Sequence, residues 1–160
     1  MKEIAHVNAL GLPGMVDVSR KLATTRRAVA RCVIELPAPT LARLRADAWR
    51  VGKGPVIDTA IIAATQAVKR THELIPFCHP LPLDSCVVSI AERDTSGLVI
   101  ECEVVAHART GVEMEALTGV TVAALTVFDM CKSMGHDMRI GDLRVVSKSG
   151  GTHDFAESSA

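Results

Sequence analysis

An aspartate and a lysine fall on one stripe of the longest helix that the sequence predicts, which runs from Thr110 to about Met134. At about 100° per residue, Asp129 and Lys132 are neighbours on this stripe. The same stripe carries Met114, Thr118, Thr121 and Leu125, with Glu115 at its edge. Because each charge shifts the protonation equilibrium of the other, such a pair can donate and accept protons. An exposed ion pair at i, i+3 is the plain structural alternative.

A loop lysine is a second candidate for acid–base or anion-binding chemistry. Lys53 lies between Gly52 and Gly54, where the absence of side chains lets the backbone approach a ligand closely. The segment is not a phosphate-binding P-loop, because Asp47 stands at the position of its first glycine and Pro55 follows Gly54. Taken alone, Lys53 is equally consistent with a solvated surface charge.

A histidine held between prolines is the third candidate. Phe77, Cys78 and His79 lie between Pro76 and Pro80, which make a stiff, non-helical loop. A side chain in such a loop is positioned at a small entropic cost, which suits hydrogen bonding or proton transfer by His79. The alternatives are a histidine that satisfies the backbone and a Cys/His metal ligand. The sequence contains no H-E-x-x-H and too few paired ligands for a zinc site, so no metal is expected.

Two cations at the ends of strands complete the candidates. Arg26 comes just before the first predicted strand, and Lys148 ends the last one. Lys148 is followed by Ser149 and the flexible pair Gly150-Gly151. Each of these features alone is typical of an ordinary protein surface, so their role depends on which residues the fold brings together.

The bulk composition excludes several classes of function. The 160 residues suffice for one domain with a buried core. With 18 Lys+Arg against 18 Asp+Glu, no overall charge attracts nucleic acid or an anionic membrane, and three Phe, one Trp and no Tyr offer no stacking platform. No run of ~18 apolar residues and no apolar signal core are found, so a cytoplasmic protein is expected. The five cysteines form no C-x-x-C, and four lie in apolar runs typical of buried, reduced thiols.

The elements that position the candidates follow from the periodicity of the apolar residues. Alternation predicts a strand from Arg27 to Leu36, and Thr40 is expected to cap a short helix that ends near Trp49. Further along, the pattern predicts a helix at 57–74, a hairpin of strands at 85–92 and 98–107, and a last strand at 143–148.

The long helix is expected to open at a capping box of Thr110 and Glu113 and to stop at Gly135. The order of strand, two helices, hairpin, helix and strand is that of a ferredoxin-like split βαβ fold with an extra helix in the first crossover. It predicts an α+β protein with an antiparallel sheet packed by helices. One domain is expected at 26–151, between an irregular arm at 1–25 and a flexible tail at 152–160.

Seven segments, in order, resemble the signature of the cyclic pyranopterin monophosphate synthase family. The longest and most specific are Leu74–Leu81, which contains I-P-F-C-H-P-L, and Thr110–Thr118, which reads T-G-V-E-M-E-A-L-T. The others are Met15–Ser19, Lys53-Gly54, Ala67–Thr71, Asp129–Lys132 and Lys148–Gly151. The resemblance extends from His6 to Gly151 and so covers nearly the whole chain.

The resemblance implies a lyase of molybdenum cofactor biosynthesis. Such an enzyme converts (8S)-3′,8-cyclo-7,8-dihydroguanosine 5′-triphosphate into cyclic pyranopterin monophosphate and pyrophosphate. By this resemblance the catalytic residues are Lys53, Asp129 and Lys132. The residues that surround the substrate are, on the same basis, Phe77, Cys78, His79, Met114, Glu115, Glu113, Arg26 and Lys148.

The resemblance also implies an assembly, a ferredoxin-like subunit in a homohexamer built as a trimer of dimers, with active sites at the dimer interfaces. No resident cofactor is expected, and any Mg²⁺ would arrive bound to the triphosphate of the substrate. The only partner expected besides further copies of the chain is this nucleotide-derived small molecule, with no nucleic acid and no membrane.

The demands of this reaction fit the residue types. Ring opening and reclosure need proton donors and acceptors, and we assign Lys132 and Asp129 as the acid–base pair, with Lys53 as a further acid. Loss of pyrophosphate needs cations, for which Arg26, Lys148 and Lys53 are the candidates. The carboxylates Glu113 and Glu115 suit the guanine-derived amine and the ring N–H groups.

Three positions depart from the pattern of the family. Ile61 replaces a polar residue, Pro55 stands where an aspartate is usual, and Phe77 replaces a leucine. The first two put the local loop geometry in question. Two other functional classes stay open from the sequence. One is a non-catalytic ferredoxin-like binding module, and the other is a metal-dependent nucleotide pyrophosphatase or cyclase, which needs a tighter carboxylate cluster than the sequence displays.

Overall fold

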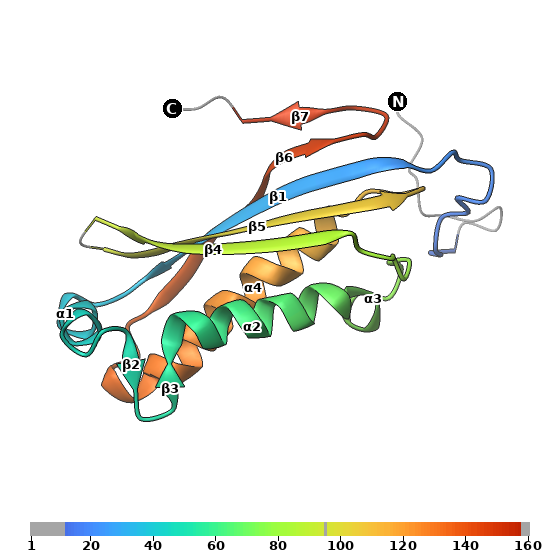
Figure 1. Ribbon diagram of the computed structural model, residues 1–160. Helices are drawn as coiled ribbons and strands as arrows, with labels where there is room; N and C mark the ends of the chain where they lie inside the picture. The colour runs from blue at the N-terminus through green and yellow to red at the C-terminus, as the bar shows by residue number, and fades with distance from the viewer. Residues whose placement is uncertain (1–11, 95, 158–160) are drawn as a thin grey trace.

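The computed structural model describes residues 12–94 and 96–157 and shows an antiparallel sheet with helices packed on one face (Figure 1). The sheet has the strand order β4-β5-β1-β6-β7, and a separate hairpin pairs β2 with β3. The strands are β1 (Thr24–Glu35), β2 (Arg50–Val51), β3 (Gly54–Pro55), β4 (Ser85–Arg93), β5 (Gly97–Ala108), β6 (Arg139–Ser149) and β7 (Phe155–Ala156). The helices are α1 (Ala38–Ala46), α2 (Val56–Lys69), α3 (Thr71–Leu74), α4 (Glu113–Cys131) and the 3-10 helix η1 (Lys132–Met134).

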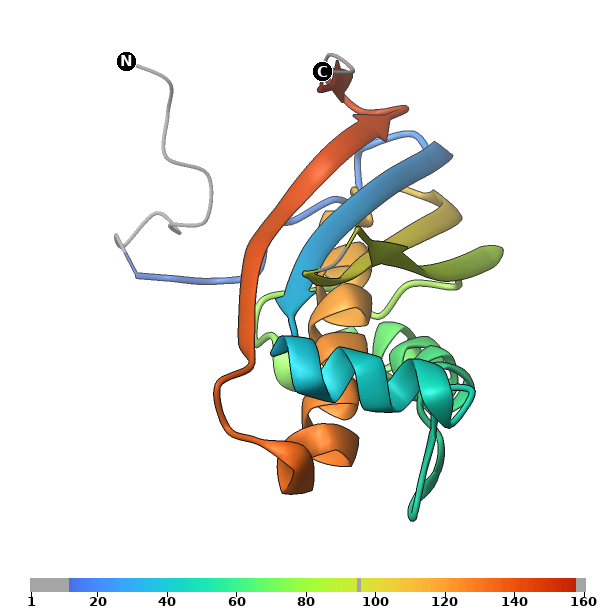
Figure 2. The same cartoon turned by 90° about the vertical axis from the view of Figure 1, so that its left-hand side faces the viewer.

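The connectivity is that of a ferredoxin-like fold. Strand β1 lies in the middle of the sheet, antiparallel to both β5 and β6. Helices α1 and α2 separate β1 from the hairpin β4–β5, and α4 leads back to β6, which Figure 2 shows beside β1 and above α4. This is the split βαβ arrangement, with α1 as the extra helix of the first crossover. The predicted α+β fold class is confirmed.

The core lies between the sheet and the helices α2 and α4. Alternate residues of β1 point into it, and Ala28, Ala30, Cys32 and Ile34 are fully buried. Helix α4 meets them with an apolar face, which comprises Ala116, Val120, Ala123, Val127 and Met130. The segment Glu113–Met134 is long and apolar enough to cross a membrane, but 56% of its most apolar window is buried inside the domain. It is therefore the core helix of this fold.

A glycine in α4 sets how closely the helix approaches its neighbours. A Cβ at Gly119 would lie 2.7 Å from Sγ of Cys102 in β5 and 2.8 Å from Cγ2 of Val68 in α2. Both distances are shorter than side-chain carbons tolerate, so only glycine fits without repacking. Helix α4 thus packs closely against both β5 and α2 at this position.

Two predicted helix caps are wrong. Helix α1 begins at Ala38 after Pro37, without a side-chain cap, and Thr40 lies inside it and is buried. Pro39 takes the first turn, where its fixed φ and missing N–H are compatible with a helix start. Helix α4 begins at Glu113 after Val112, also without a side-chain cap, so the predicted capping box does not form.

Other boundaries differ modestly from the prediction. The helix predicted at 57–74 is divided at Arg70 into α2 and α3. Strand β6 begins at Arg139, earlier than predicted. The short strand β7 pairs with β6 inside the segment expected to be a tail. Residues 1–11 of the expected arm and 158–160 of the expected tail lie outside the described residues, and the division into arm, domain and tail stays a prediction.

The cysteines behave largely as predicted. All five are free thiols, and Cys32, Cys102 and Cys131 are buried. Burial raises the pKa of the Cys131 thiol to about 11. Cys86, expected in the core, is only half-buried.

Candidate active site

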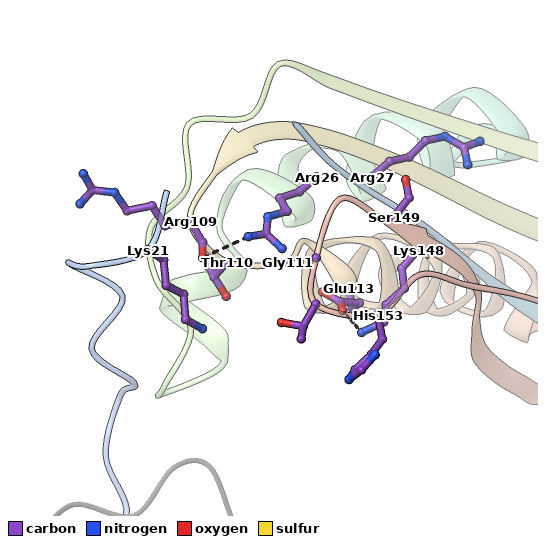
Figure 3. A pocket seen from close by; sticks show the side chains of 12 residues that line it. Lys21, Arg26, Arg27, Arg109, Thr110, Gly111, Glu113, Lys148, Ser149 and His153 are labelled. Atoms are coloured by element: carbon purple, nitrogen blue, oxygen red, sulfur yellow. Dashed lines mark hydrogen bonds and ion pairs between the residues drawn. The ribbon is translucent and has the colours of Figure 1, made fainter. Parts of the chain in front are cut away.

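A positively charged cavity lies where the start of β1, the end of β6 and the N-terminus of α4 meet. It has a volume of about 210 Å³ and is called here the cationic cleft (Figure 3). Its charged and titratable side chains are Lys21, Arg26, Arg27, Arg109, Lys148, His153 and Glu113. Five cations and one carboxylate line the cleft, which suits it to a multiply charged anion, although Nη2 of Arg27 is paired with Oε2 of Glu103 at 2.5 Å.

Arg26 is held in the cleft by the chain on both sides of it. Its Nε donates to the carbonyl oxygen of Ala108 at 3.3 Å, at the end of β5. On the other side a Cβ at Gly151 would lie 2.8 Å from Nη1 of Arg26. Gly150 has φ +83°, and a Cβ there would lie 1.9 Å from the carbonyl oxygen of Thr25. Gly150 is therefore needed for β6 to end beside Arg26, whereas a Cβ at Gly151 would meet only the flexible end of the Arg26 side chain.

The cleft contains one ion pair between the sheet and the helix. Nζ of Lys148 lies 2.9 Å from Oε1 of Glu113, the first residue of α4. A Cβ at Gly111 would lie 1.8 Å from Oε2 of Glu113, so the glycine makes room for this carboxylate. The T-G-V-E segment thus aims Glu113 at Lys148 instead of capping the helix.

A second cavity adjoins the cleft and is called here the acidic pocket. Its volume is about 300 Å³, and it shares Lys21, Thr110, Gly111 and Glu113 with the cleft. Most of the residues predicted at the substrate line it, namely Phe77, Cys78, His79, Met114, Glu115 and Glu113. The loop that carries His79 follows α3, where the N–H of Cys78 donates to the carbonyl oxygen of Ile75 at 3.1 Å. Val16, Val18, Leu81 and the aromatic ring of Phe77 give this pocket its apolar wall.

Glu115 is the buried acid of this pocket. Its side chain is 4% exposed, and burial, followed by the nearby charge of Glu113, raises the pKa of its carboxyl to about 7. Burial, followed by the Glu115 charge, also raises the pKa of the Cys78 thiol. Glu115 can therefore gain or lose a proton near neutral pH, as a general acid or base must.

The three predicted catalytic residues meet at the other end of α4. Nζ of Lys53 lies 2.6 Å from Oδ2 of Asp129 and 3.0 Å from its carbonyl oxygen, and Nζ of Lys132 lies 2.8 Å from Oδ1. Hydrogen bonds from Lys132 and then Lys53 lower the pKa of Asp129 to about 2. These three residues are called here the lysine–aspartate cluster. All three side chains are about half exposed. The hairpin of β2 and β3 carries Lys53 there, and Pro55 fits its second strand.

Within one subunit the predicted site residues form two separate groups. Arg26, Lys148 and Glu113 share the cleft and the acidic pocket with His79 and Glu115. The lysine–aspartate cluster lies about 24 Å away along α4, at 1.5 Å per residue between residues 113 and 129. The hairpin β2–β3 and the start of β1 accordingly lie at opposite ends of the molecule in Figure 1.

Several residues of the cleft escaped the sequence prediction. Lys21 lies in a stretch without periodicity. Arg27 was assigned only as the first residue of the predicted strand at 27–36. Arg109 directly precedes the T-G-V-E-M-E segment, and this adjacency was a usable signal. His153 lies beyond the last predicted strand and carries no motif. As to metals, the described residues contain no group of three or more His, Cys, Asp and Glu side chains placed to hold an ion.

The model of the MoaC family matches residues 15–151, which include both cavities except for Thr152 and His153. The chain belongs to the MoaC family. The resemblance found in the sequence is thereby confirmed, and the lysine–aspartate cluster lies inside the matched region of this MoaC-family chain.

Individual relatives of the MoaC family agree with this assignment. The chain is 55% identical over 152 residues to the cyclic pyranopterin monophosphate synthase of Xanthomonas oryzae pv. oryzae, which covers 95% of this chain and 92% of that protein. It is 45% identical over 149 residues to the enzyme of the same name from Listeria welshimeri, with 93% and 92% covered. The molybdenum cofactor biosynthesis bifunctional protein of Synechocystis is also 45% identical over 157 residues, but the match covers only 45% of it.

Proposed function

We propose that this chain is a cyclic pyranopterin monophosphate synthase, a lyase of molybdenum cofactor biosynthesis. It would convert (8S)-3′,8-cyclo-7,8-dihydroguanosine 5′-triphosphate into cyclic pyranopterin monophosphate and pyrophosphate. One observation supports this proposal most strongly, in addition to the family. A cleft lined by five cations opens directly into a pocket with a buried acid and a histidine, which suits a ligand with a triphosphate at one end and a nitrogen-rich ring at the other.

The cationic cleft is the proposed site of the triphosphate. Phosphate oxygens would replace the Glu113 carboxylate as the partner of Lys148, with Arg26 beside it. Cations that are already in place stabilise the negative charge that develops on the leaving pyrophosphate. Glu113, released from Lys148, would then accept a hydrogen bond from the guanine-derived amine.

The acidic pocket is the proposed site of the ring system. Phe77 and Met114 offer apolar surface to its faces, while Glu115, Cys78 and His79 offer polar groups to its edge. Because the pKa of Glu115 is close to neutrality, this carboxyl is suited to pass a proton to and from a ring nitrogen as the purine opens and the pterin closes.

The lysine–aspartate cluster is the proposed acid–base centre. With its pKa near 2, Asp129 stays ionised and positions both lysines, so the acid is a lysine ammonium of Lys53 or Lys132. In the pair assigned from the sequence, Lys132 is therefore proposed as an acid, and Asp129 as the carboxylate that orients it and not as a base. Proton transfer needs contact at about 3 Å, so a cluster on the far end of α4 can serve the ring only from a neighbouring subunit.

The active site is therefore proposed to form between two copies of the chain, in a homohexamer arranged as a trimer of dimers. Each interface would join the cleft and acidic pocket of one subunit to the lysine–aspartate cluster of the next. A two-fold dimer creates two such sites at once. We further propose a cytoplasmic enzyme without a resident cofactor or metal, to which any Mg²⁺ comes with the substrate.

Turnover of the cyclic dihydroguanosine triphosphate tests the proposal. The purified protein is incubated with this compound, the products are oxidised, and the fluorescent pterin and the released pyrophosphate are measured. We expect both products in equal amounts. Pyrophosphate release from plain GTP without any pterin would reject the proposal and indicate a nucleotide pyrophosphatase, and binding without turnover would indicate a non-catalytic module.

A further inference from the structure

The turn between β6 and β7 brings a histidine to the cationic cleft. His153 lines the cleft together with Arg26, Lys148 and Glu113, just beyond the residues 15–151 that match the family. In Figure 3 its imidazole lies next to the ion pair between Lys148 and Glu113. Among the residues that the structure describes, no hydrogen bond or ion pair engages this ring. The side chain is therefore at a charged site and available to a ligand.

The turn that carries His153 is held firmly at both ends. Strand β7 pairs with the end of β6, and the N–H of Gly150 donates to Oδ1 of Asp154 at 3.0 Å. Beyond β7, Nε and Nη2 of Arg144 bind the two carboxylate oxygens of Glu157 at 2.6 and 3.1 Å. A side chain presented by a tied turn loses little conformational freedom when it binds, so the placement favours a ligand contact.

We propose that His153, in its protonated form, binds the phosphoryl oxygens of the part of the substrate that leaves as pyrophosphate. This inference rests on the proposed function, which supplies the triphosphate. His153 lines the cleft but not the acidic pocket, whereas Lys21 and Glu113 line both. A ligand with its ring in the pocket and its phosphates in the cleft therefore presents the phosphates furthest from the ring to His153.

The charges around His153 suit a bound anion. Besides His153, the cleft presents several cations, namely Lys21, Arg26, Arg27, Arg109 and Lys148, and a single lining carboxylate, Glu113. An imidazolium at His153 would add a charge-assisted hydrogen bond to a phosphoryl oxygen. Because only a protonated ring carries a charge, the contribution of His153 to anion binding should be larger at acidic than at alkaline pH.

Calorimetric titration with inorganic pyrophosphate tests the inference. The full chain is compared with His153→Ala and His153→Lys at pH 6 and at pH 8, so that the ionisation of pyrophosphate is the same within each comparison. We expect His153→Ala to weaken binding about three- to tenfold at pH 6 and much less at pH 8. His153→Lys should restore tight binding at both values. His136→Ala, which removes an exposed histidine outside the cleft, should change nothing.

Two results overturn the inference. One is an equal affinity of the wild type and His153→Ala at pH 6, and the other is an affinity unaffected by Lys148→Ala, which would mean that pyrophosphate binds elsewhere. Turnover of the cyclic triphosphate by the same wild-type preparation keeps the two proposals distinct. Normal turnover with an unchanged pyrophosphate affinity of His153→Ala removes the role of His153 and leaves the proposed function intact.

Discussion

The two ends of α4 hold their carboxylates in opposite ways. At the N-terminal end Glu115 is buried, and burial raises the pKa of its carboxyl to about 7. At the C-terminal end Asp129 is exposed between Lys132 and Lys53, which lower the pKa of its carboxyl to about 2. Glu115 can therefore exchange a proton near neutral pH, whereas Asp129 stays charged and orients amines. Two acids whose environments push their pKa values apart are suited to different roles in one reaction.

Neither end is sufficient for the proposed reaction. The cleft and the acidic pocket would bind both parts of the substrate, but they lack the proposed acids Lys53 and Lys132. The lysine–aspartate cluster has that acid, but the cavities that fit the substrate lie at the other end of the helix. Under the proposed function the chain therefore divides binding and proton transfer between two surfaces, which a second copy would bring together.

The largest expected effect comes from the C-terminal end. Lys53→Ala should reduce turnover about a thousandfold or more, because a general acid and the partner of Asp129 are both lost. The fold should persist, since Lys53 is exposed, and circular dichroism checks this. Arg93→Ala at the exposed end of β4 is the matched control and should keep full activity. Near-normal turnover of both Lys53→Ala and Lys132→Ala would remove the catalytic role of the cluster.

Mixing two inactive variants tests whether the ends cooperate between subunits. Lys53→Ala damages one end and His79→Ala the other, so a mixed dimer retains one intact site. After unfolding and refolding together in equal amounts, random pairing should recover about a quarter of wild-type activity. The variants refolded separately serve as controls. Absence of recovery, with sedimentation showing that mixed oligomers form, would contradict a site shared between subunits.

Glu115 gives a stability change that depends on pH. The usual pKa of 4.5 is raised to about 7 in the folded protein, so the native state keeps a proton that the unfolded chain loses as the pH rises through this window. Folding stability should therefore fall by about 3 kcal/mol between pH 4.5 and 7 and stay level above it. Urea unfolding of Glu115→Gln should lack this slope, whereas exposed Glu73→Gln should retain it. An unchanged slope in Glu115→Gln would show that other groups cause it.

The smallest effect is expected at the end of β6. Gly150→Ala places a methyl group against the carbonyl oxygen of Thr25 at a positive φ, and should cost about 1–3 kcal/mol. It should also raise the KM, because Arg26 and Lys148 flank this turn. Gly141→Ala adds the same methyl where no atom lies within 4 Å, and thermal melting should show a smaller loss there. Equal losses would mean that the close contact at Gly150 relaxes freely.

Much of the fold could be predicted because it depends on local periodicity. The alternation along 27–36 marks the central strand, and the apolar face of α4 gives the core helix. The caps could not be predicted from their motif alone. Thr110 and Glu113 have the spacing of a capping box, but the long-range attraction of Lys148 takes the Glu113 side chain away from the helix backbone. Short-range patterns fail where a partner distant in the sequence offers a stronger interaction.

The predicted site residues gather in two groups, and their union in one active site stays a prediction. Lys53 meets Asp129 across 76 positions of sequence separation. Spacing alone did not reveal that α4 separates this cluster from His79 and Glu113. Residues on one face of a long helix can still lie far apart along its axis. Lys21 and His153 were missed because each reaches the cleft from a segment without a regular period.

The close packing around Gly119 limits which insertions α4 can accept. Because α4 packs closely against β5 and α2, the helix acts as a fixed spacer between the proposed binding groups and the proposed proton donors. Inserting one residue would lengthen it by about 1.5 Å and rotate everything beyond the insertion by about 100°. In the proposed two-fold pair the same displacement would be repeated in the other copy, so one insertion would misalign both proposed sites. The proposed site therefore depends on the length of α4.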